Sequence, residues 1–331
     1  MPDALLSVEG LRKSFPGRGG GLSRRAVRAV ADVSFHLRRG ETLGLVGESG
    51  CGKSTLARLV LHLIAPDGGS VLIDGTPFTG ASERQRRKLR RRLQIVFQDA
   101  LSSLNPRMTV GVNIAEPMRL QGLGTPAERH DAARELLQLV GLRAGDAARY
   151  PHEFSGGQCQ RIAIARALIL HPDIVVFDEA VSALDVSIRS QILRLILDLQ
   201  QRLGLSYIFI SHDLGVVKRV ADRIAVMYLG RIVEIGPAED VVRNPQHPYT
   251  RALLRAIPIA DPRRMRVQDL GLAAADVASQ APPAAGCAFQ PRCTLRLAVC
   301  VQEVPPTVQV APGHTAMCHH VAPGNALASR A

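Results

Sequence analysis

The segment LGLVGESGCGKST, residues 43–55, decides the fold class of this chain of 331 residues. Its first four residues form a short apolar run that is typical of a buried strand, and the apolar spacing after Lys53 predicts a helix. Between them lies the complete spacing G-x-x-x-x-G-K-S, residues 47–54, whose glycines let backbone N–H groups point inward at phosphate oxygens. A strand, this loop and a helix start together predict a nucleotide site.

Each part of this phosphate loop has an expected role. Lys53 would reach the β- and γ-phosphates, and the Ser54 hydroxyl would hold Mg²⁺. Cys51 leaves two interpretations open, because a thiolate is favoured at a helix start but a small neutral side chain also fills such a turn. The predicted nucleotide-binding residues of the loop are Gly47, Ser49, Gly50, Cys51, Gly52, Lys53, Ser54 and Thr55.

Two carboxylates end the apolar run DIVVFDE, residues 173–179. In a parallel sheet the carboxyl ends of the strands form the ligand crevice, so both acids are expected beside the phosphates. Asp178 is predicted to be a partner of Mg²⁺. Glu179 is predicted to be the general base that polarises the attacking water.

Gln98 and His212 also follow apolar runs, residues 93–97 and 206–211. The amide of Gln98 can contact water and metal without adding charge, so it is a candidate catalytic residue and Mg²⁺ ligand. His212 is predicted to hydrogen-bond the γ-phosphate or Glu179. Either residue alone would more often be an ordinary loop residue, so both predictions depend on the other motifs.

A second glycine-rich turn occurs in FSGGQCQR, residues 154–161, where Ser155 and Gln158 fit a helix capping box. Two glycines between them expose the amides of the helix start, which is a second anion site. The sequence has one phosphate loop and no repeat of it. Two copies arranged head to tail would let each such turn, here called the signature turn (residues 155–158), close over the nucleotide of the other.

Together these motifs resemble the nucleotide-binding subunit of an ABC transporter over residues 5–258. The resemblance implies an α/β fold, with a P-loop NTPase (RecA-like) core, an antiparallel β subdomain and an α-helical signature subdomain at about residues 107–172. It implies an ATPase with ATP and Mg²⁺ as cofactors. It also implies that Phe15 stacks on adenine, that Asp185 contacts a second subunit, and that a partner's nucleotide is covered by Ser155, Gly156, Gly157 and Gln158.

A narrower resemblance lies in FQDALSSLNPR, residues 97–107, and NPQHPYTRALL, residues 244–254. These segments are similar to ATPases of dipeptide and oligopeptide importers, specifically the F-type member of a D/F pair. The chain has Ala100 and Ala180 where that family usually has proline, and neither change removes a catalytic atom.

The same resemblance implies a set of partners and a location. The partners are a second ABC ATPase subunit of D type, two membrane permease subunits and, indirectly, an extracytoplasmic solute-binding protein. The solute would be a peptide or a related small molecule. The chain would lie at the cytoplasmic face of the membrane, attached through the permeases, because the sequence has no apolar run of eighteen residues.

The net charge of +12 and the basic run at residues 84–92 leave a nucleic-acid partner to consider. A solvated basic helix or an anionic membrane surface explains the same charge, so no nucleic acid is expected. Soluble cassette proteins that act on nucleic acid usually carry tandem cassettes or added modules, which this sequence lacks. A GTPase is disfavoured because no lysine has an Asn-Lys-x-Asp context, and a small-molecule kinase would leave the signature turn unexplained.

The final segment, residues 259–331, is predicted to be a C-terminal extension rich in Ala, Pro and Gly. Clustered thiols in a cytosolic chain favour metal binding over disulfides, although their spacing matches neither a zinc ribbon nor a cluster-binding C-x-x-C-x-x-C run. Tails of this type in the peptide-importer family resemble a domain that can carry a [4Fe–4S] cluster, while zinc and a metal-free tail remain alternatives. The candidate ligands are Cys287, Cys293, Cys300 and Cys318.

Overall fold

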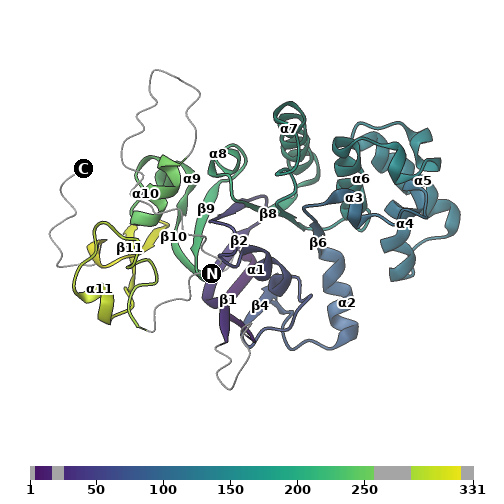
Figure 1. Ribbon diagram of the computed structural model, residues 1–331. Helices are drawn as coiled ribbons and strands as arrows, with labels where there is room; N and C mark the ends of the chain where they lie inside the picture. Colours follow the sequence, from purple (N-terminus) through teal and green to yellow (C-terminus); the bar gives the residue numbers. More distant parts are fainter. Residues whose placement is uncertain (1–3, 17–25, 257–284, 322–331) are drawn as a thin grey trace. The chain divides into compact units, whose positions relative to one another are not determined.

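A computed structural model describes residues 4–16, 26–256 and 285–321 (Figure 1). The chain divides into two compact units: unit 1 is Met1–Ser7, His36–Thr42 and Leu72–Ile210, and unit 2 is Val8–Phe35, Leu43–Val71 and Ser211–Ala331. The predicted domain boundary near residue 258 lies outside the described residues.

Unit 1 is built on three parallel strands, β6 (Leu93–Val96), β7 (Ile174–Asp178) and β8 (Ser206–Ser211). Val96 pairs with Phe177, and Asp178 pairs with Ile210. Every residue of β7 is buried, as expected for a strand covered on both faces of a parallel sheet. Because the strands are in register, the polar residues that follow β6 and β7 leave the sheet at the same edge.

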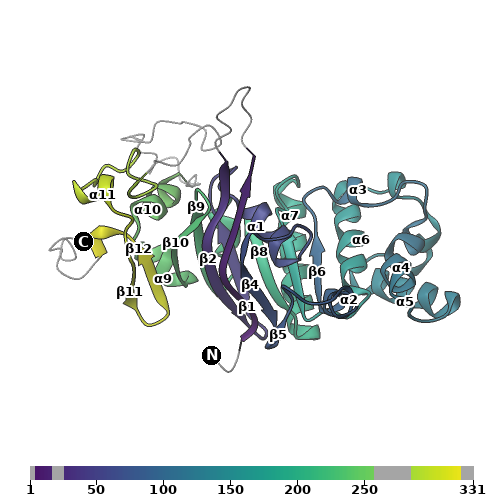
Figure 2. The same cartoon turned by 90° about the horizontal axis from the view of Figure 1, so that it is seen from below.

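Most of the remaining elements of unit 1 are helices. The cores of α4, α5 and α6 contact one another, and Figure 2 shows them gathered with α3. This is the helical subdomain that the sequence predicted. The bounds in unit 1 are α2 (Glu83–Arg92), α3 (Ala100–Ser103), α4 (Val110–Gln121), α5 (Pro126–Leu139), η1 (Ala144–Ala148), η2 (Pro151–Glu153), α6 (Gly156–Leu168) and α7 (Val186–Leu203).

Unit 2 contains the strand before the phosphate loop, β3 (Thr42–Val46), which runs parallel to β9 (Arg223–Tyr228). β10 (Arg231–Pro237) is antiparallel to β9. The helices of this unit are α1 (Lys53–Val60), α8 (Leu214–Val217), α9 (Ala238–Arg243), α10 (Pro248–Arg255) and α11 (Val299–Gln302), with a short 3₁₀ turn, η5 (His319–Val321).

The C-terminal extension continues the sheet of unit 2, which the sequence analysis did not predict. The hairpin β11 (Thr307–Ala311) and β12 (His314–Met317) adds to β10, with Glu234 opposite Ala316 (Figure 2). The extension is therefore joined by backbone hydrogen bonds to β10, in the order β11-β12-β10-β9-β3.

The predicted antiparallel β subdomain corresponds to a four-stranded sheet in the order β2-β1-β4-β5. Its strands are β1 (Ala4–Phe15), β2 (Val27–Arg38), β4 (Gly68–Ile73) and β5 (Thr76–Pro77). Buried and exposed residues alternate along much of β2, as expected for a sheet with one face in the core.

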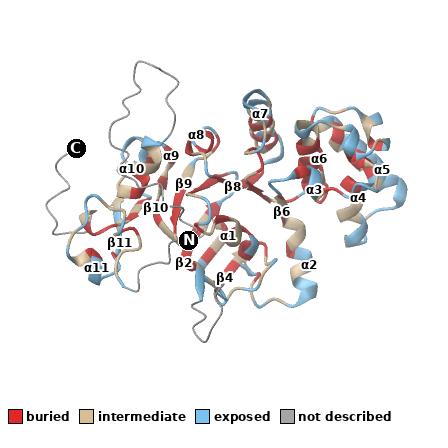
Figure 3. Ribbon diagram, in the orientation of Figure 1, coloured by how far each residue is buried: buried red, intermediate tan, exposed pale blue. Residues whose placement is uncertain are grey.

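Buried residues follow the strands and the inner sides of the helices (Figure 3). In unit 1 the ring of Phe177 meets Tyr207 edge-on at a centroid distance of 5.1 Å and lies 5.9 Å from Phe209. Burying each such side chain contributes about 1.5–3 kcal/mol, which anchors the strand that ends in Asp178. Among the described residues, no helix has both the length and the apolar character needed to cross a bilayer.

Candidate functional site

The phosphate loop lies in unit 2, between the end of β3 and the start of α1. Gly50 and Gly52 have φ angles of 79° and 111°, a region that side chains disfavour. A Cβ on Gly52 would lie 2.2 Å from the Ala29 carbonyl oxygen, and one on Gly47 would lie 2.2 Å from the Met227 oxygen. The loop therefore follows a path that glycine alone permits at these positions.

Lys53 is the first residue of α1, and its side chain turns back over the loop. Its Nζ donates to the carbonyl oxygens of Gly47 at 2.8 Å and Glu48 at 3.0 Å. The residue is only 4% exposed, so its positive charge is held in one place and is little screened. Ser54, the predicted Mg²⁺ ligand, is the next residue and is partly buried.

Cys51 packs beneath the loop. The residue is 1% exposed, and burial raises the pKa of its thiol, although Lys53, whose Nζ lies 3.9 Å from Sγ, opposes this effect. Gly230 also donates from its backbone N to the Cys51 carbonyl oxygen at 2.8 Å. Of the two interpretations left open by the sequence, the structure supports the neutral filling residue, because desolvation disfavours the thiolate.

Phe15 and His212 are both accessible in unit 2. Phe15 ends β1 with 38% of its surface exposed, and Lys13 Nζ lies 5.7 Å from its ring centroid. It is therefore not a core residue, and its position is compatible with stacking on a base. His212 is exposed between β8 and α8, where the side chain of Asp213 caps the helix by accepting from Val216 N at 3.2 Å.

The predicted acidic residues lie at the end of β7 in unit 1. Asp178 is buried, whereas Glu179 is partly exposed and has a φ angle of 51°, which is uncommon outside glycine. The Glu179 backbone N–H donates to the Ile210 carbonyl oxygen at 3.0 Å, and the Glu179 carbonyl oxygen accepts from Ser182 Oγ at 2.8 Å. These bonds hold the turn in its strained conformation.

Gln98 lies at the same edge of the unit 1 sheet. Val96 pairs with Phe177, and Gln98 and Glu179 each follow this pair by two residues. Gln98 is exposed and stands just before Asp99, whose side chain caps α3 by accepting from Ser102 N at 3.1 Å. Unit 1 therefore brings together three predicted site residues, Gln98, Asp178 and Glu179.

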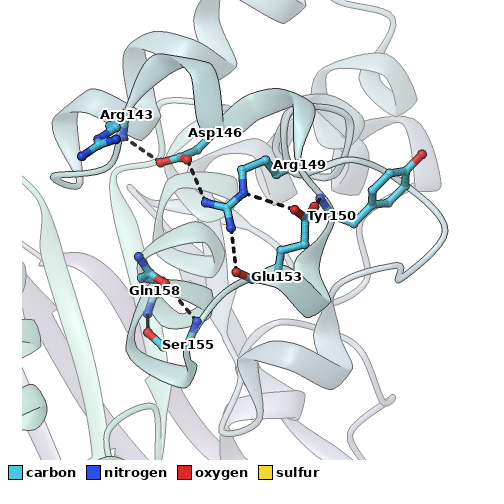
Figure 4. A network of polar contacts seen from close by, with 7 residues as sticks. All are labelled: Arg143, Asp146, Arg149, Tyr150, Glu153, Ser155 and Gln158. Atoms are coloured by element: carbon cyan, nitrogen blue, oxygen red, sulfur yellow. Dashed lines mark hydrogen bonds and ion pairs between the residues drawn. The ribbon is translucent and has the colours of Figure 1, made fainter.

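The signature turn caps α6 in unit 1 (Figure 4). Gln158 N donates to Ser155 Oγ at 3.4 Å, and Ser155 N donates to Gln158 Oε1 at 2.9 Å, which confirms the predicted capping box. Ser155 and Gly156 are exposed. A Cβ on Gly157 would lie 2.5 Å from Ile188 Cγ2, so this glycine is required by the packing of α6 against α7.

Arg149 supports the segment that leads into the signature turn (Figure 4). It donates to Asp146 Oδ1 at 3.2 Å and to the Glu153 carbonyl oxygen at 2.8 Å, and it lies 4.4 Å from the ring centroid of Phe154. The hydrogen bond from Tyr150 N to Glu153, together with Arg149, lowers the pKa of that carboxyl. Spacing alone gave no signal for this network, because its charges resemble an ordinary solvated surface.

Asp185 begins α7 and is exposed. Its side chain makes no capping hydrogen bond to the helix, and the turn before it is held instead by Arg189, whose Nη2 donates to the Leu184 oxygen at 3.1 Å. The neighbouring Val186 is 77% exposed, which is unusual for a large apolar side chain. These features are compatible with the predicted contact to a second subunit.

The structure does not support the predicted [4Fe–4S] cluster. Burial raises the pKa of Cys287 and of Cys293, and it raises that of Cys318 to about 11. Within the described part of the chain, however, no group of three or more His, Cys, Asp or Glu side chains is arranged to hold a metal ion. The four candidate ligands concerned are Cys287, Cys293, Cys300 and Cys318.

Two residues that the sequence analysis did not assign to the site contact the phosphate loop within unit 2. The Tyr249 hydroxyl accepts from Glu48 N at 2.9 Å, and Arg292 donates to both oxygens of the Glu48 carboxylate. Tyr249 lies in the segment of residues 244–254 that the sequence analysis had already singled out. No sequence pattern indicated the role of Arg292, because this residue lies 244 positions from Glu48.

Comparison with known proteins agrees with these features. The sequence pattern of the family described as "ABC transporter" matches residues 30–182, and that described as "Oligopeptide/dipeptide transporter, C-terminal region" matches residues 233–300. The chain is 51% identical over 328 residues to the probable peptide ABC transporter ATP-binding protein y4tS of Sinorhizobium fredii, covering 98% of this chain and 92% of the relative. It is 44% identical to the oligopeptide transport ATP-binding protein AppF of Bacillus subtilis, covering 96% and 97%.

Solved structures give the same result for the fold. The ATP-binding cassette MJ0796, in a dimeric post-hydrolysis state bound to ADP and Pi, superposes with a TM-score of 0.62 at 28% identity, covering 70% of this chain and 98% of that one. For cbiO1 from Clostridium perfringens, part of the ABC transporter complex cbiONQ, the TM-score is 0.63 at 27% identity, covering 73% and 92%. The chain therefore belongs to the ATP-binding cassette ATPases of ABC transporters, in the group that carries the oligopeptide/dipeptide transporter C-terminal region.

Proposed function

We propose that this chain binds and hydrolyses ATP and couples hydrolysis to the uptake of peptides, or of a related small solute, through permease subunits. The observation that carries the proposal is the presence, in one chain, of a glycine-dependent phosphate loop, a carboxylate edge at Asp178 and Glu179, and an exposed signature turn. The peptide as solute is supported by the names of the relatives, which are peptide transport proteins.

Binding of ATP would begin at the phosphate loop. Lys53 would hold the β- and γ-phosphates, and Phe15 would stack on adenine. The Ser54 hydroxyl, the Asp178 carboxylate and the Gln98 amide oxygen are oxygen donors of the kind that Mg²⁺ prefers, so these three residues would hold the ion. When bound, Mg²⁺ supplies positive charge to the phosphate oxygens.

Hydrolysis would depend on Glu179. Its carboxylate would accept a proton from water while the water oxygen bonds to the γ-phosphorus and the bond from phosphorus to the bridging oxygen of ADP breaks. The products are ADP and phosphate. His212 would donate a hydrogen bond to the γ-phosphate or to Glu179, and the backbone of Glu179 is held by its hydrogen bonds to Ile210 and Ser182.

A second cassette would complete the site. The exposed amides after Ser155 would cover the γ-phosphate bound by the partner, and Asp185 would contact that partner across the interface. The expected assembly contains a D-type ATPase, two permease subunits and a solute-binding protein. In it the chain would lie at the cytoplasmic face of the membrane, held through the permeases.

The proposal is tested by Glu179→Gln in the assembly with its permeases. ATP hydrolysis is expected to fall by about 10²- to 10⁴-fold, because the amide cannot accept the proton, whereas ATP binding remains. The matched control is Glu135→Gln on the exposed face of α5, which is expected to hydrolyse ATP at the parental rate. Substantial hydrolysis by Glu179→Gln would exclude Glu179 as the base. ATP-dependent uptake of a labelled peptide tests the solute, and failure across a panel of di- to pentapeptides would exclude peptides.

A further inference from the structure

A carboxylate within the phosphate loop raises an electrostatic problem. Glu48 lies between Gly47 and Ser49, in the loop that would hold the phosphates of ATP. A negative charge at this position repels the nucleotide unless a positive charge compensates it, because the interaction of two like charges a few ångströms apart is large where water is partly excluded.

Arg292 of the C-terminal extension compensates this charge. Its Nη1 lies 2.7 Å from Glu48 Oε2, and its Nη2 lies 2.9 Å from Oε1. Such a bidentate pair is among the stronger charge-assisted hydrogen bonds. The Arg292 side chain is 8% exposed and that of Glu48 is 28% exposed, so water and salt screen the pair less than they screen a surface ion pair. The hydrogen bond to Glu48 also raises the pKa of Arg292 above its ordinary value.

Aromatic rings fix the direction of the Arg292 guanidinium. Its central carbon lies 5.9 Å from the ring centroids of both Tyr228 and Phe289, within the range of cation–π contacts. Phe289 belongs to the extension, and its ring meets Tyr228 edge-on at 5.2 Å and lies 5.5 Å from Tyr249. The extension therefore inserts Phe289 into a buried aromatic cluster (Tyr228, Tyr249 and Phe289) and presents Arg292 to the loop beside it.

The backbone of Glu48 is held separately by Tyr249. The buried Tyr249 hydroxyl accepts from Glu48 N at 2.9 Å. Tyr249 N in turn donates to His247 Nδ1 at 3.0 Å, and His247 N donates to Glu234 Oε2 at 2.8 Å. Glu234 also lies 2.8 Å from His314 Nε2 on β12, so this series of hydrogen bonds runs from the extension to the loop.

We propose that Arg292 and Tyr249 are positioning residues for the phosphate loop, so that the C-terminal extension sets the affinity of this cassette for nucleotide. Arg292 neutralises Glu48 and leaves the charge of Lys53 available to phosphate. Tyr249 fixes the backbone at the point where the loop leaves β3. The proposal rests on the proposed function, in which this loop binds ATP.

The test is equilibrium binding of a fluorescent ATP analogue with Mg²⁺ to the full chain. Arg292→Gln is expected to weaken binding about tenfold, because it leaves an unpaired carboxylate beside the phosphates. Adding Glu48→Gln to Arg292→Gln removes that carboxylate and is expected to restore affinity to within about twofold to threefold of the parent. A loss of affinity that came only from damage to the fold would not be restored in the double variant.

Tyr249→Phe tests the second contact, because it removes the hydroxyl and keeps the ring. Binding is expected to weaken about three- to tenfold, the range for loss of one hydrogen bond. The control on the C-terminal extension, matched to Arg292→Gln, is Arg296→Gln at an exposed residue, which is expected to bind as the parent does. Urea unfolding of each variant is measured alongside, and the comparison uses variants whose midpoint matches that of the parent.

Lys53→Ala separates this proposal from the one on which it rests. If Lys53→Ala binds the analogue as tightly as the parent does, the loop is not the nucleotide site and the proposed function fails. If Lys53→Ala loses binding while Arg292→Gln and Tyr249→Phe keep parental affinity, the loop binds nucleotide and only the positioning role is overturned. Failure of Glu48→Gln to restore Arg292→Gln overturns the electrostatic role of Arg292.

Discussion

The phosphate loop before α1 and the signature turn before α6 both place glycines and backbone N–H groups at the start of a helix, but their support differs. Around the phosphate loop, Gly47 and Gly52 meet backbone oxygens, and Lys53 and Cys51 are buried. The signature turn is capped by its own Ser155 and Gln158 and is exposed. The first turn is shaped by the protein around it, whereas the second is shaped by its own sequence and is open to another molecule.

The largest difference between the two turns is expected from the same substitution in each. Gly52→Ala places a methyl group 2.2 Å from the Ala29 oxygen at a φ of 111°, so the free energy of unfolding should fall by about 3 kcal/mol. Gly156→Ala is the matched control, because its Cβ would meet Leu184 Cδ2 at an ordinary 3.9 Å. Urea unfolding measures both. Equal losses would show that the two turns are supported alike.

An effect of up to the same size is expected from pH, which should act on the buried network behind the phosphate loop. Burial lowers the pKa of His247 from 6.5 to about 4. The unfolded chain therefore takes up the proton more readily, so this contribution to stability is complete above pH 6.5 and is lost as pH falls towards 4. The loss amounts to about 3 kcal/mol at most.

The measurement for His247 is urea unfolding between pH 7 and pH 4. In His247→Asn this part of the pH dependence should disappear, because asparagine does not titrate and its side chain can still accept from Tyr249 N. If the free energy of unfolding changes with pH in the same way in the parent and in His247→Asn, the acid sensitivity belongs to other groups and not to the network behind the phosphate loop.

The smallest effect is expected at the signature turn itself. Ser155→Ala removes one half of the capping box and should lower the free energy of unfolding by about 1 kcal/mol. Thr109→Ala at the start of α4 is the control, since the Thr109 side chain makes no capping hydrogen bond. A loss from Ser155→Ala no larger than that of the control would show that the turn is held by tertiary contacts, as the phosphate loop is.

The difference between the turns also explains which predictions from the sequence succeeded. The capping box could be predicted, because its partners lie three residues apart. The strand ends could be predicted as well. Gln98, Asp178 and Glu179 stand at or just after the ends of apolar runs, and the carboxyl ends of parallel strands lie at one edge of a sheet. The left-handed turn at Glu179 was not predicted, because it depends on the bond to Ile210 from a neighbouring strand.

The C-terminal extension was the least predictable part of the chain. Its clustered cysteines and the family resemblance suggested a metal centre, but the arrangement of side chains in space, in which the described residues form no metal-binding group, is not given by the sequence. Its hairpin β11–β12 joins the sheet through pairing with β10, some 80 residues away. Such pairings leave only a weak local pattern in a sequence that is otherwise rich in Ala, Pro and Gly.

The sequence by itself determined the family, the order of the motifs and the capping box of the signature turn, because each depends on residue types at short and fixed spacing. Only the tertiary structure decided the desolvation of the Cys51 thiol, the strain at Glu179 and the compensation of Glu48 by Arg292. These properties arise from burial and from contacts between residues far apart in the chain, since desolvation and Coulomb interactions depend on distance in space.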